Sequence, residues 1–349
     1  MGKLFNTLKL QLNYSLLFII FITFLRVGSW SPTLSENRKF QGSHRPTVGN
    51  NSYFQIWRND FLSAAAPRDE TGLIRGIFLG EANFIPQSII SKFQTAGLTH
   101  VIAASGFNCW IVGFLFLLMT KVILLPCKNF LHPSQRVLQT FQNLELLVMA
   151  VGAWLFFFWT NRSPPVTRAV VMISARNTFR YLQWPVRFTR LLIVQYFLSL
   201  CIEPKLFSSA SFQLTFACLT GIVASEVIKK NLIQYLKSIN PRRISRATEA
   251  CISYLLTNFG ICLCVAPITW IFFAEINFTS LLTNWFVGPP VAMIIMPLGL
   301  TTMLSLKIFP AAAGYLCSIN NFFCKFLSLM ISEYLKIVPH LIYAPYRDF

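Results

Sequence analysis

Seven apolar runs of spanning or near-spanning length dominate the chain and limit what it can fold into. They cover roughly residues 98–125, 143–160, 191–206, 208–228, 251–273, 279–306 and 309–332. A helix needs about 20 mostly apolar residues to cross a bilayer. Charged residues make up 12% of the chain, whereas soluble proteins carry about 25%. The sequence therefore predicts an all-α polytopic integral membrane protein, a helical bundle with about seven to nine spanning or re-entrant helices.

The N-terminal part is expected to be built differently. Residues 10–25 form a short apolar run after a basic start, which fits either a signal peptide or a retained anchor. No small-residue cleavage site follows, so we favour an anchor helix over residues 1–26, followed by a short polar extramembrane segment over 27–71. Residues 72–97 are half apolar and are expected to be amphipathic and interfacial. The adjacent Pro289 and Pro290 predict a kink or break in the run 279–306.

The formal net charge of +18 has two compatible explanations. Cytoplasmic loops of membrane proteins collect Lys and Arg whatever the function, and a protein that handles a polyanion also needs cations. Two connections, 161–190 and 229–246, are strongly basic, and the first contains no acidic residue. The positive-inside rule places both in the cytoplasm. Counting the alternating spans back from these cytoplasmic connections puts residues 72–97 on the cytoplasmic side. An anchor helix whose N-terminus is cytoplasmic puts residues 27–70 on the opposite side of the membrane. These two placements disagree. Either 72–97 dips into the membrane or one span is re-entrant.

The first informative segment is GLTHVIAASGFN, residues 97–108. It is expected to open a membrane helix, on which His100, Ala104 and Asn108 would share one face because they are four residues apart. Polar groups inside a membrane usually face a partner or a cavity. His100, Ser105 and Asn108 are therefore candidates for a polar lining, and helix packing with satisfied side chains is the alternative.

The second segment is SPPVTRAVVM, residues 163–172. Proline suits the first turn of a helix, so a helix is expected from Pro165 onward. On it Arg168, Arg176 and Arg180 would form one slowly drifting stripe. Such a stripe could follow a phosphate backbone, because the guanidinium group binds phosphate through two parallel hydrogen bonds. Snorkelling arginines at a cytoplasmic helix edge are the alternative.

Two further polar positions lie in apolar surroundings. Gln213, in the segment ASFQLTFA, needs a partner or water if it is buried. It is a candidate for the lining or for an interhelical hydrogen bond. Asn284, in TNWFVGPP, precedes the proline pair, which could free carbonyls toward a cavity.

These segments resemble the signatures of the ComEC family of competence proteins. That family has GLxHLLAxSGLH, GxSPSVxRAxxM and FQLSFxA in this order, and the resemblance covers residues 72–335, leaving 336–349 as a tail. Two departures stand out: Asn108 replaces a His and Asn161 replaces a Gly. The resemblance implies transport of single-stranded DNA across the bacterial cytoplasmic (inner) membrane during natural transformation. It also implies a periplasmic DNA receptor, a cytoplasmic helicase-like motor and strand-binding proteins as partners, with a homo-oligomer possible.

Full-length members of that family carry an extracellular OB-like domain and a nuclease domain of metallo-β-lactamase type. Neither is expected here, since residues 27–70 are too few for the first and no HxHxDH segment occurs. We therefore expect no enzyme activity, and we expect no cofactor or metal, because the His and Cys residues match no metal-site spacing. Two alternatives remain open: a small-solute transporter and a degenerate family member that no longer transports.

Overall fold

The computed structural model describes residues 53–130, 135–239, 245–273, 276–337 and 342–343. The expected anchor over 1–26, the first part of the expected polar segment and most of the expected tail lie outside these residues. The described chain is almost entirely helical, and the two-residue strands β1 (Ile276–Asn277) and β2 (Ile342–Tyr343) pair antiparallel. The all-α prediction is confirmed.

Within the described residues, five helical stretches are long and apolar enough to cross a membrane. They are α6 (Gly106–Phe130), α7 (Gln135–Trp159), α10 (Ala210–Ile239), α11 (Arg246–Phe273) and the continuous stretch from Ser280 to Ile308. Helix α9 (Phe188–Ile202) is apolar but shorter. A helical membrane bundle is thus confirmed, while the expected count of seven to nine spanning or re-entrant helices is not.

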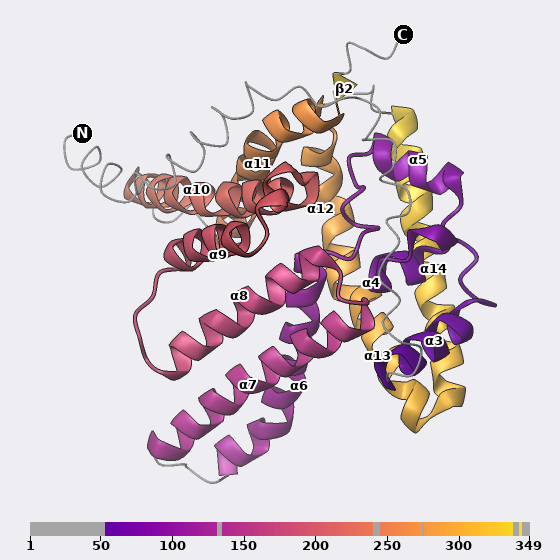
Figure 1. The fold of residues 1–349 in the computed structure, drawn as a ribbon, viewed down its shortest axis with the longest axis horizontal. Coiled ribbons are helices and arrows are strands. Elements are labelled where there is room, and N and C mark those ends of the chain that lie inside the picture. The colour runs from indigo at the N-terminus through magenta and orange to yellow at the C-terminus, as the bar shows by residue number, and fades with distance from the viewer. Residues whose placement is uncertain (1–52, 131–134, 240–244, 274–275, 338–341, 344–349) are drawn as a thin grey trace. The chain divides into compact units, whose positions relative to one another are not determined.

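The chain divides into two compact units. Among the described residues, unit 1 comprises 192–285 and 342–343, and unit 2 comprises 53–191 and 286–337. In unit 1 the short η3 (Pro204–Ser208) precedes α10 in the chain. Helices α10 and α11 then pack against each other as an antiparallel pair (Figure 1). Gly221 and Gly260 face each other, and a Cβ on Gly221 would lie 2.5 Å from the Gly260 carbonyl oxygen. Small residues at such a contact let two membrane helices approach closely.

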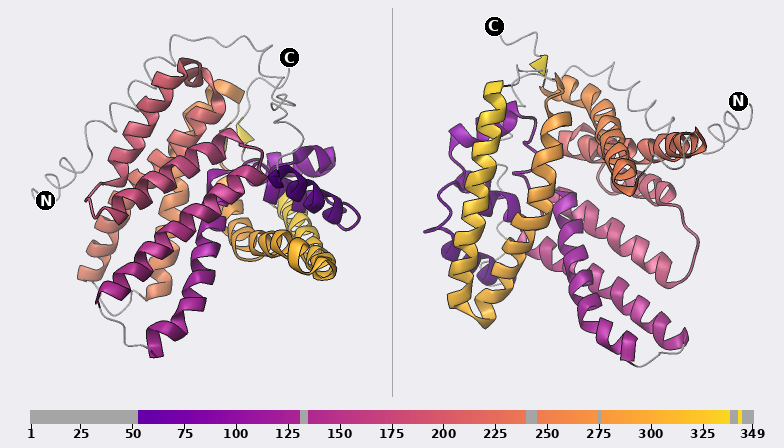
Figure 2. Two further views of the ribbon diagram at one scale, coloured as in Figure 1. Left: turned by 60° about the horizontal axis from the view of Figure 1, so that its bottom comes forward. Right: turned by 180° about the vertical axis from the view of Figure 1, so that it is seen from behind.

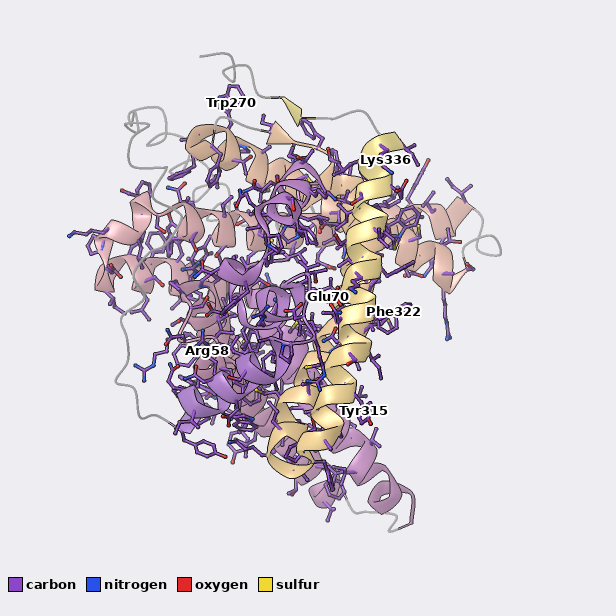
Figure 3. All side chains as sticks on the ribbon, turned by 90° about the vertical axis from the view of Figure 1, so that its right-hand side faces the viewer. Arg58, Glu70, Trp270, Tyr315, Phe322 and Lys336 are labelled. Atoms are coloured by element: carbon purple, nitrogen blue, oxygen red, sulfur yellow. The ribbon has the colours of Figure 1, made fainter. Side chains whose placement is uncertain are left out.

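Unit 2 is organised around a helical hairpin of α13 (Met296–Ile308) and α14 (Pro310–Ile337), with α3 (Tyr53–Ala65), α4 (Leu73–Leu79) and α5 (Gln87–Thr95) along it (Figures 1 and 2). Ion pairs of 2.7 Å, Lys307 with Asp60 and Lys325 with Glu70, hold α3 and the loop after it to the hairpin. Tyr315 stands on the exposed side of α14 (Figure 3). In the same unit, α6 and α7 pack against α8 (Pro164–Tyr181).

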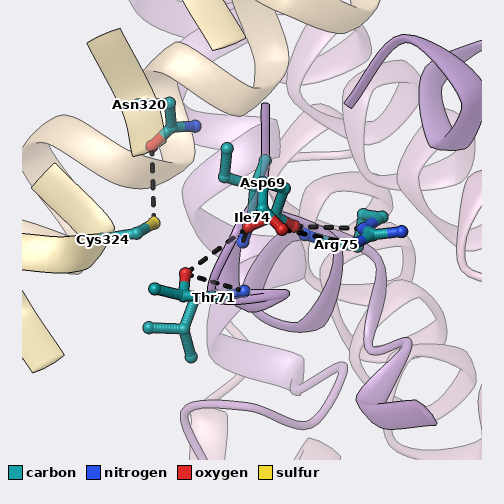
Figure 4. A network of polar contacts seen from close by, with 7 residues as sticks. Asp69, Thr71, Ile74, Arg75, Asn320 and Cys324 are labelled. Carbon is teal, nitrogen blue, oxygen red and sulfur yellow. Dashed lines mark hydrogen bonds and ion pairs between the residues drawn. The ribbon is translucent and has the colours of Figure 1, made fainter. Parts of the chain in front are cut away.

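Helix α4 lies in the hydrophobic core of unit 2, and all seven of its residues are buried. The Asp69 carboxylate accepts hydrogen bonds from the backbone N–H groups of Ile74 and Arg75, at 3.2 and 3.1 Å, and from the Arg75 side chain at 3.1 Å (Figure 4). The Asp69 carboxylate thus accepts hydrogen bonds from the backbone N–H groups at the start of α4 and from Arg75, the one charged residue of this helix. Because these polar groups have partners, α4 can be buried on every side. The interfacial expectation for 72–97 is therefore wrong for α4, although α5 is largely exposed and buries only Phe93.

The proline pair does not break the last spanning stretch. The chain stays helical from α12 (Ser280–Pro290) through a π-helical turn η4 (Val291–Ile295) into α13. Proline lacks an N–H group, so the carbonyls one turn earlier lose their helical partner and the hydrogen-bond pattern shifts. Near this irregular turn the side-chain amide of the buried Asn320 donates to the Ile295 carbonyl at 3.2 Å.

Candidate functional site

The segment 97–105 is a loop, and the expected helix starts only at Gly106. The Ser105 hydroxyl accepts a hydrogen bond from the Asn108 backbone N–H at 3.1 Å, which is how serine caps a helix start. His100 lies in an exposed turn, whereas Asn108 is buried in the first turn of α6. The prediction that His100 and Asn108 share one helix face is therefore wrong.

Asn108 joins two elements of unit 2. Its side-chain amide donates to the Ile77 carbonyl at 2.9 Å, in the last turn of α4. Carbonyls at a helix C-terminus have no partner within the helix and need one from elsewhere. Asparagine supplies the donor without a titratable group. The residue that departs from the family's usual His thus makes a structural contact in this conformation, between the start of α6 and the end of α4.

The second motif packs directly on the first. Helix α8 begins at Pro164, as the prolines predict. The Ser163 hydroxyl donates to the Ala104 carbonyl at 3.5 Å. A Cβ on Gly106 would lie 3.2 Å from the Ala169 Cβ. We call the contact region formed by the end of α4, residues 104–108 and the start of α8 the motif junction.

The turn before α8 has unusual backbone geometry. Asn161 and Arg162 have φ angles of 52° and 57°, in the left-handed region. Glycine adopts this region freely, and asparagine tolerates it better than most other residues. The left-handed backbone at Asn161 is therefore one that the Gly of the family signature could also adopt. The Gln55 side-chain amide also donates to the Asn161 side-chain oxygen at 3.0 Å, which ties the turn to α3.

The predicted arginine stripe divides along α8. Arg168 is buried, whereas Arg176 and Arg180 are exposed. Positions four apart drift by about 40° around a helix, so the later arginines leave the buried face. Burial lowers the pKa of the Arg168 guanidinium to about 10, which leaves it cationic at neutral pH. The stripe thus has one buried and two exposed cations.

The other two predicted residues belong to unit 1. The Gln213 side-chain amide donates to the Phe207 carbonyl at 2.6 Å, and its buried side-chain oxygen has no hydrogen-bond partner among the described residues. The expectation that a buried Gln213 needs a partner is confirmed for the amide nitrogen. Asn284 is half-buried, and its backbone carbonyl accepts a hydrogen bond from the Tyr254 hydroxyl at 2.6 Å. A lining role for these residues stays a prediction.

Sequence reasoning missed Asp69 and Arg75, the buried ion pair that makes α4 possible. A signal was present: Asp and Thr precede the apolar segment LIRGIFL, and glycines bracket it at Gly72 and Gly80. An Asp or Thr before an apolar run followed by glycine is typical of a short capped helix.

Comparison with known proteins agrees with the motifs. A family model described as Competence protein matches residues 77–344, more than half of the chain. The chain belongs to the Competence protein family. The matched region begins within α4 and includes the motif junction.

One curated relative is similar over a shorter region. ComE operon protein 3 of Bacillus subtilis (strain 168) is 26% identical over 169 residues, which make up 48% of this chain and 20% of that protein. The match therefore covers about a fifth of the relative's length. No solved structure matches the chain.

Proposed function

We propose that this chain passes single-stranded DNA across the bacterial cytoplasmic membrane during natural transformation. The proposal rests on membership of the Competence protein family together with five candidate spans. Threading of one strand requires a helical membrane protein with cations for the phosphates and tolerance of any base sequence.

The observation that carries the proposal is the distribution of arginine on α8. The connection 161–190 holds six arginines and no acidic residue, so no carboxylate within it neutralises them. Arg168 remains cationic although it is buried beside the motif junction, and Arg176 and Arg180 are exposed. A polyanion could contact the exposed Arg176 and Arg180, with binding that weakens as salt rises.

Complementation of a deletion strain tests the proposal. Uptake of labelled DNA should be lost in the deletion, restored by the wild-type chain, and reduced by Arg168→Ala and by the double substitution of Arg176 and Arg180 to Ala. Lys336→Ala is the control, because Lys336 is an exposed cation on α14, outside α8. Unchanged transformation in the deletion strain would refute the transport function. Full rescue by the arginine variants would refute only the proposed role of these three arginines in binding DNA.

One observation is as compatible with a competence-family member that no longer transports as it is with a channel. The side-chain amides of Asn108 and Gln213, both predicted to line the path, donate to backbone carbonyls. Such contacts fit a closed interior as well as a closed state of a channel. The same deletion experiment separates these readings, because a non-transporting relative leaves DNA uptake unchanged. For a small-solute transporter, the deletion would alter solute uptake and leave transformation intact.

The remaining parts of the proposal concern partners. A periplasmic receptor would deliver the strand, and a cytoplasmic helicase-like motor with strand-binding proteins would draw it inward. The chain would act without enzymatic activity of its own. Co-purification from competent cells with each candidate partner tests these associations.

A further inference from the structure

A row of four aromatic rings crosses from α3 to α7 in unit 2. Phe54 and Phe158 stack with their ring centres 4.7 Å apart and their planes at 17°. Tyr53 extends the row at one end, 6.0 Å from Phe54, and Trp154 extends it at the other, 6.1 Å from Phe158. The central rings are half-buried, whereas Tyr53 is 59% and Trp154 41% exposed. We call these four residues the aromatic row.

Neighbouring contacts hold the aromatic row in place. The Trp57 ring meets the buried Trp159 edge-on at 5.0 Å, and its indole N–H donates to the Met303 carbonyl at 2.7 Å. The Trp154 indole N–H donates to the Ser174 hydroxyl at 3.1 Å. Contacts among α3, α7, α8 and α13 therefore hold the exposed rings in place. Little side-chain conformational entropy would be lost when these rings bind a flat ligand.

Cations accompany the row. The Lys307 ammonium lies 5.8 Å from the centre of the Tyr53 ring. The exposed Arg162 follows Phe158 by four residues, in the turn whose left-handed backbone precedes α8. Single-stranded nucleic acid is bound by aromatic faces, on which bases stack, and by cations, which contact phosphates. The aromatic row supplies the first group, and an arginine close by in the chain supplies the second.

We propose that the aromatic row and Arg162 form a stacking site for the bases of single-stranded DNA. The inference rests on the proposed function and names a contact point for its substrate. The exposed rings of Tyr53 and Trp154 would stack on bases of any sequence, and Arg162 would contact the neighbouring phosphate. Aromatic residues also gather at membrane interfaces as lipid anchors. We commit to DNA because the row lies four residues from the exposed Arg162, which belongs to the acid-free basic connection 161–190, and lipid anchoring becomes one outcome of the test.

The test compares two oligonucleotides with the full chain in detergent micelles. A short oligo-dT strand and an abasic strand of equal length carry the same phosphates, so the ratio of their affinities reports base stacking alone. The wild-type chain should prefer oligo-dT by at least about fivefold, since stacking contributes that much per base. Tyr53→Ala and Trp154→Ala should each lower this ratio toward one. Arg162→Ala should weaken both strands and leave the ratio unchanged.

Matched variants separate stacking from folding. Trp154→Phe keeps a ring and should keep the oligo-dT preference. Tyr315→Ala removes a still more exposed ring on α14, outside the row, and should behave as wild type. A wild-type chain that binds neither strand refutes the proposed function. A wild-type chain that binds both equally, or Tyr53→Ala and Trp154→Ala chains that keep the preference, refutes the stacking site and leaves the function standing. If those variants instead lose affinity only for anionic lipid vesicles, the row is a membrane anchor and the stacking site is refuted.

Discussion

The two units bury polar groups in an apolar chain by different means. In unit 2 the motif junction joins short elements far apart in sequence, as when Asn108 donates to the carbonyl of Ile77. In unit 1 two long helices approach through Gly221 and Gly260. There Gln213 bonds locally, to the carbonyl of Phe207 six residues earlier.

The difference shows which region depends on its motif sequence. Irregular backbone is tolerated at membrane depth only where protein or water satisfies its polar groups. Unit 2 contains irregular backbone in the loop 97–105, and its short helix α4 is buried on every side, so the buried polar groups there need specific partners. Unit 1 is built mainly from the long helices α10 and α11, which satisfy most of their own backbone. Substitutions should therefore be costlier at the motif junction than in unit 1.

Gly80→Ala should have the largest effect. A Cβ there would lie 2.6 Å from the Ala104 Cβ, and the φ of 74° disfavours any side chain. Overpacking costs about 1–3 kcal/mol and the left-handed backbone about 1–2 kcal/mol more. We expect a loss of about 2–5 kcal/mol in the free energy of unfolding. Denaturant titration of the purified protein, followed by tryptophan fluorescence, measures it. Wild-type stability in this variant would mean that the junction does not depend on close docking.

Gly221→Ala provides the counterpart in unit 1. Its Cβ would lie 2.5 Å from the Gly260 carbonyl oxygen, but the residue has an ordinary helical backbone. Overpacking alone predicts a loss of about 1–3 kcal/mol in the free energy of unfolding. Cysteine crosslinking between α10 and α11 should slow in parallel as the helices separate. A larger loss here than in Gly80→Ala would reverse the comparison between the units.

Asn108→Leu should cost more than Gln213→Leu. The first substitution leaves the buried Ile77 carbonyl without its donor, at a cost of about 1–3 kcal/mol. The second substitution also removes a donor, but it removes at the same time a buried side-chain oxygen that has no hydrogen-bond partner among the described residues. Its net effect should stay below about 1 kcal/mol. The same denaturant titration compares them, and equal losses would show that both amides matter alike for folding.

Sequence reasoning found the helical membrane class and the start of α8, because apolar run length and proline chemistry are local properties. It missed α4, whose burial depends on Asp69 pairing with Arg75. It also misplaced His100, because α6, capped by Ser105, begins at Gly106, nine residues after the expected helix start at Gly97. Both errors arise where hydrogen bonds override a hydrophobic pattern. The packing of the 104–108 segment against α8 could not be predicted, since it depends on contacts between residues about 60 positions apart, such as Ser163 and Ala104.

The smallest expected effect concerns Asn161, where the backbone rather than the side chain should matter. Its φ of 52° suits glycine, but its side-chain oxygen accepts a hydrogen bond from Gln55. Asn161→Gly relieves the backbone and loses one bond worth about 1 kcal/mol, so stability should change by less than about 1 kcal/mol. Asn161→Val, which is β-branched, should destabilise the turn by about 1–3 kcal/mol. Stability of Asn161→Val equal to that of Asn161→Gly would mean that the turn has no left-handed requirement. The family's Gly at this position would then need an explanation other than a left-handed backbone.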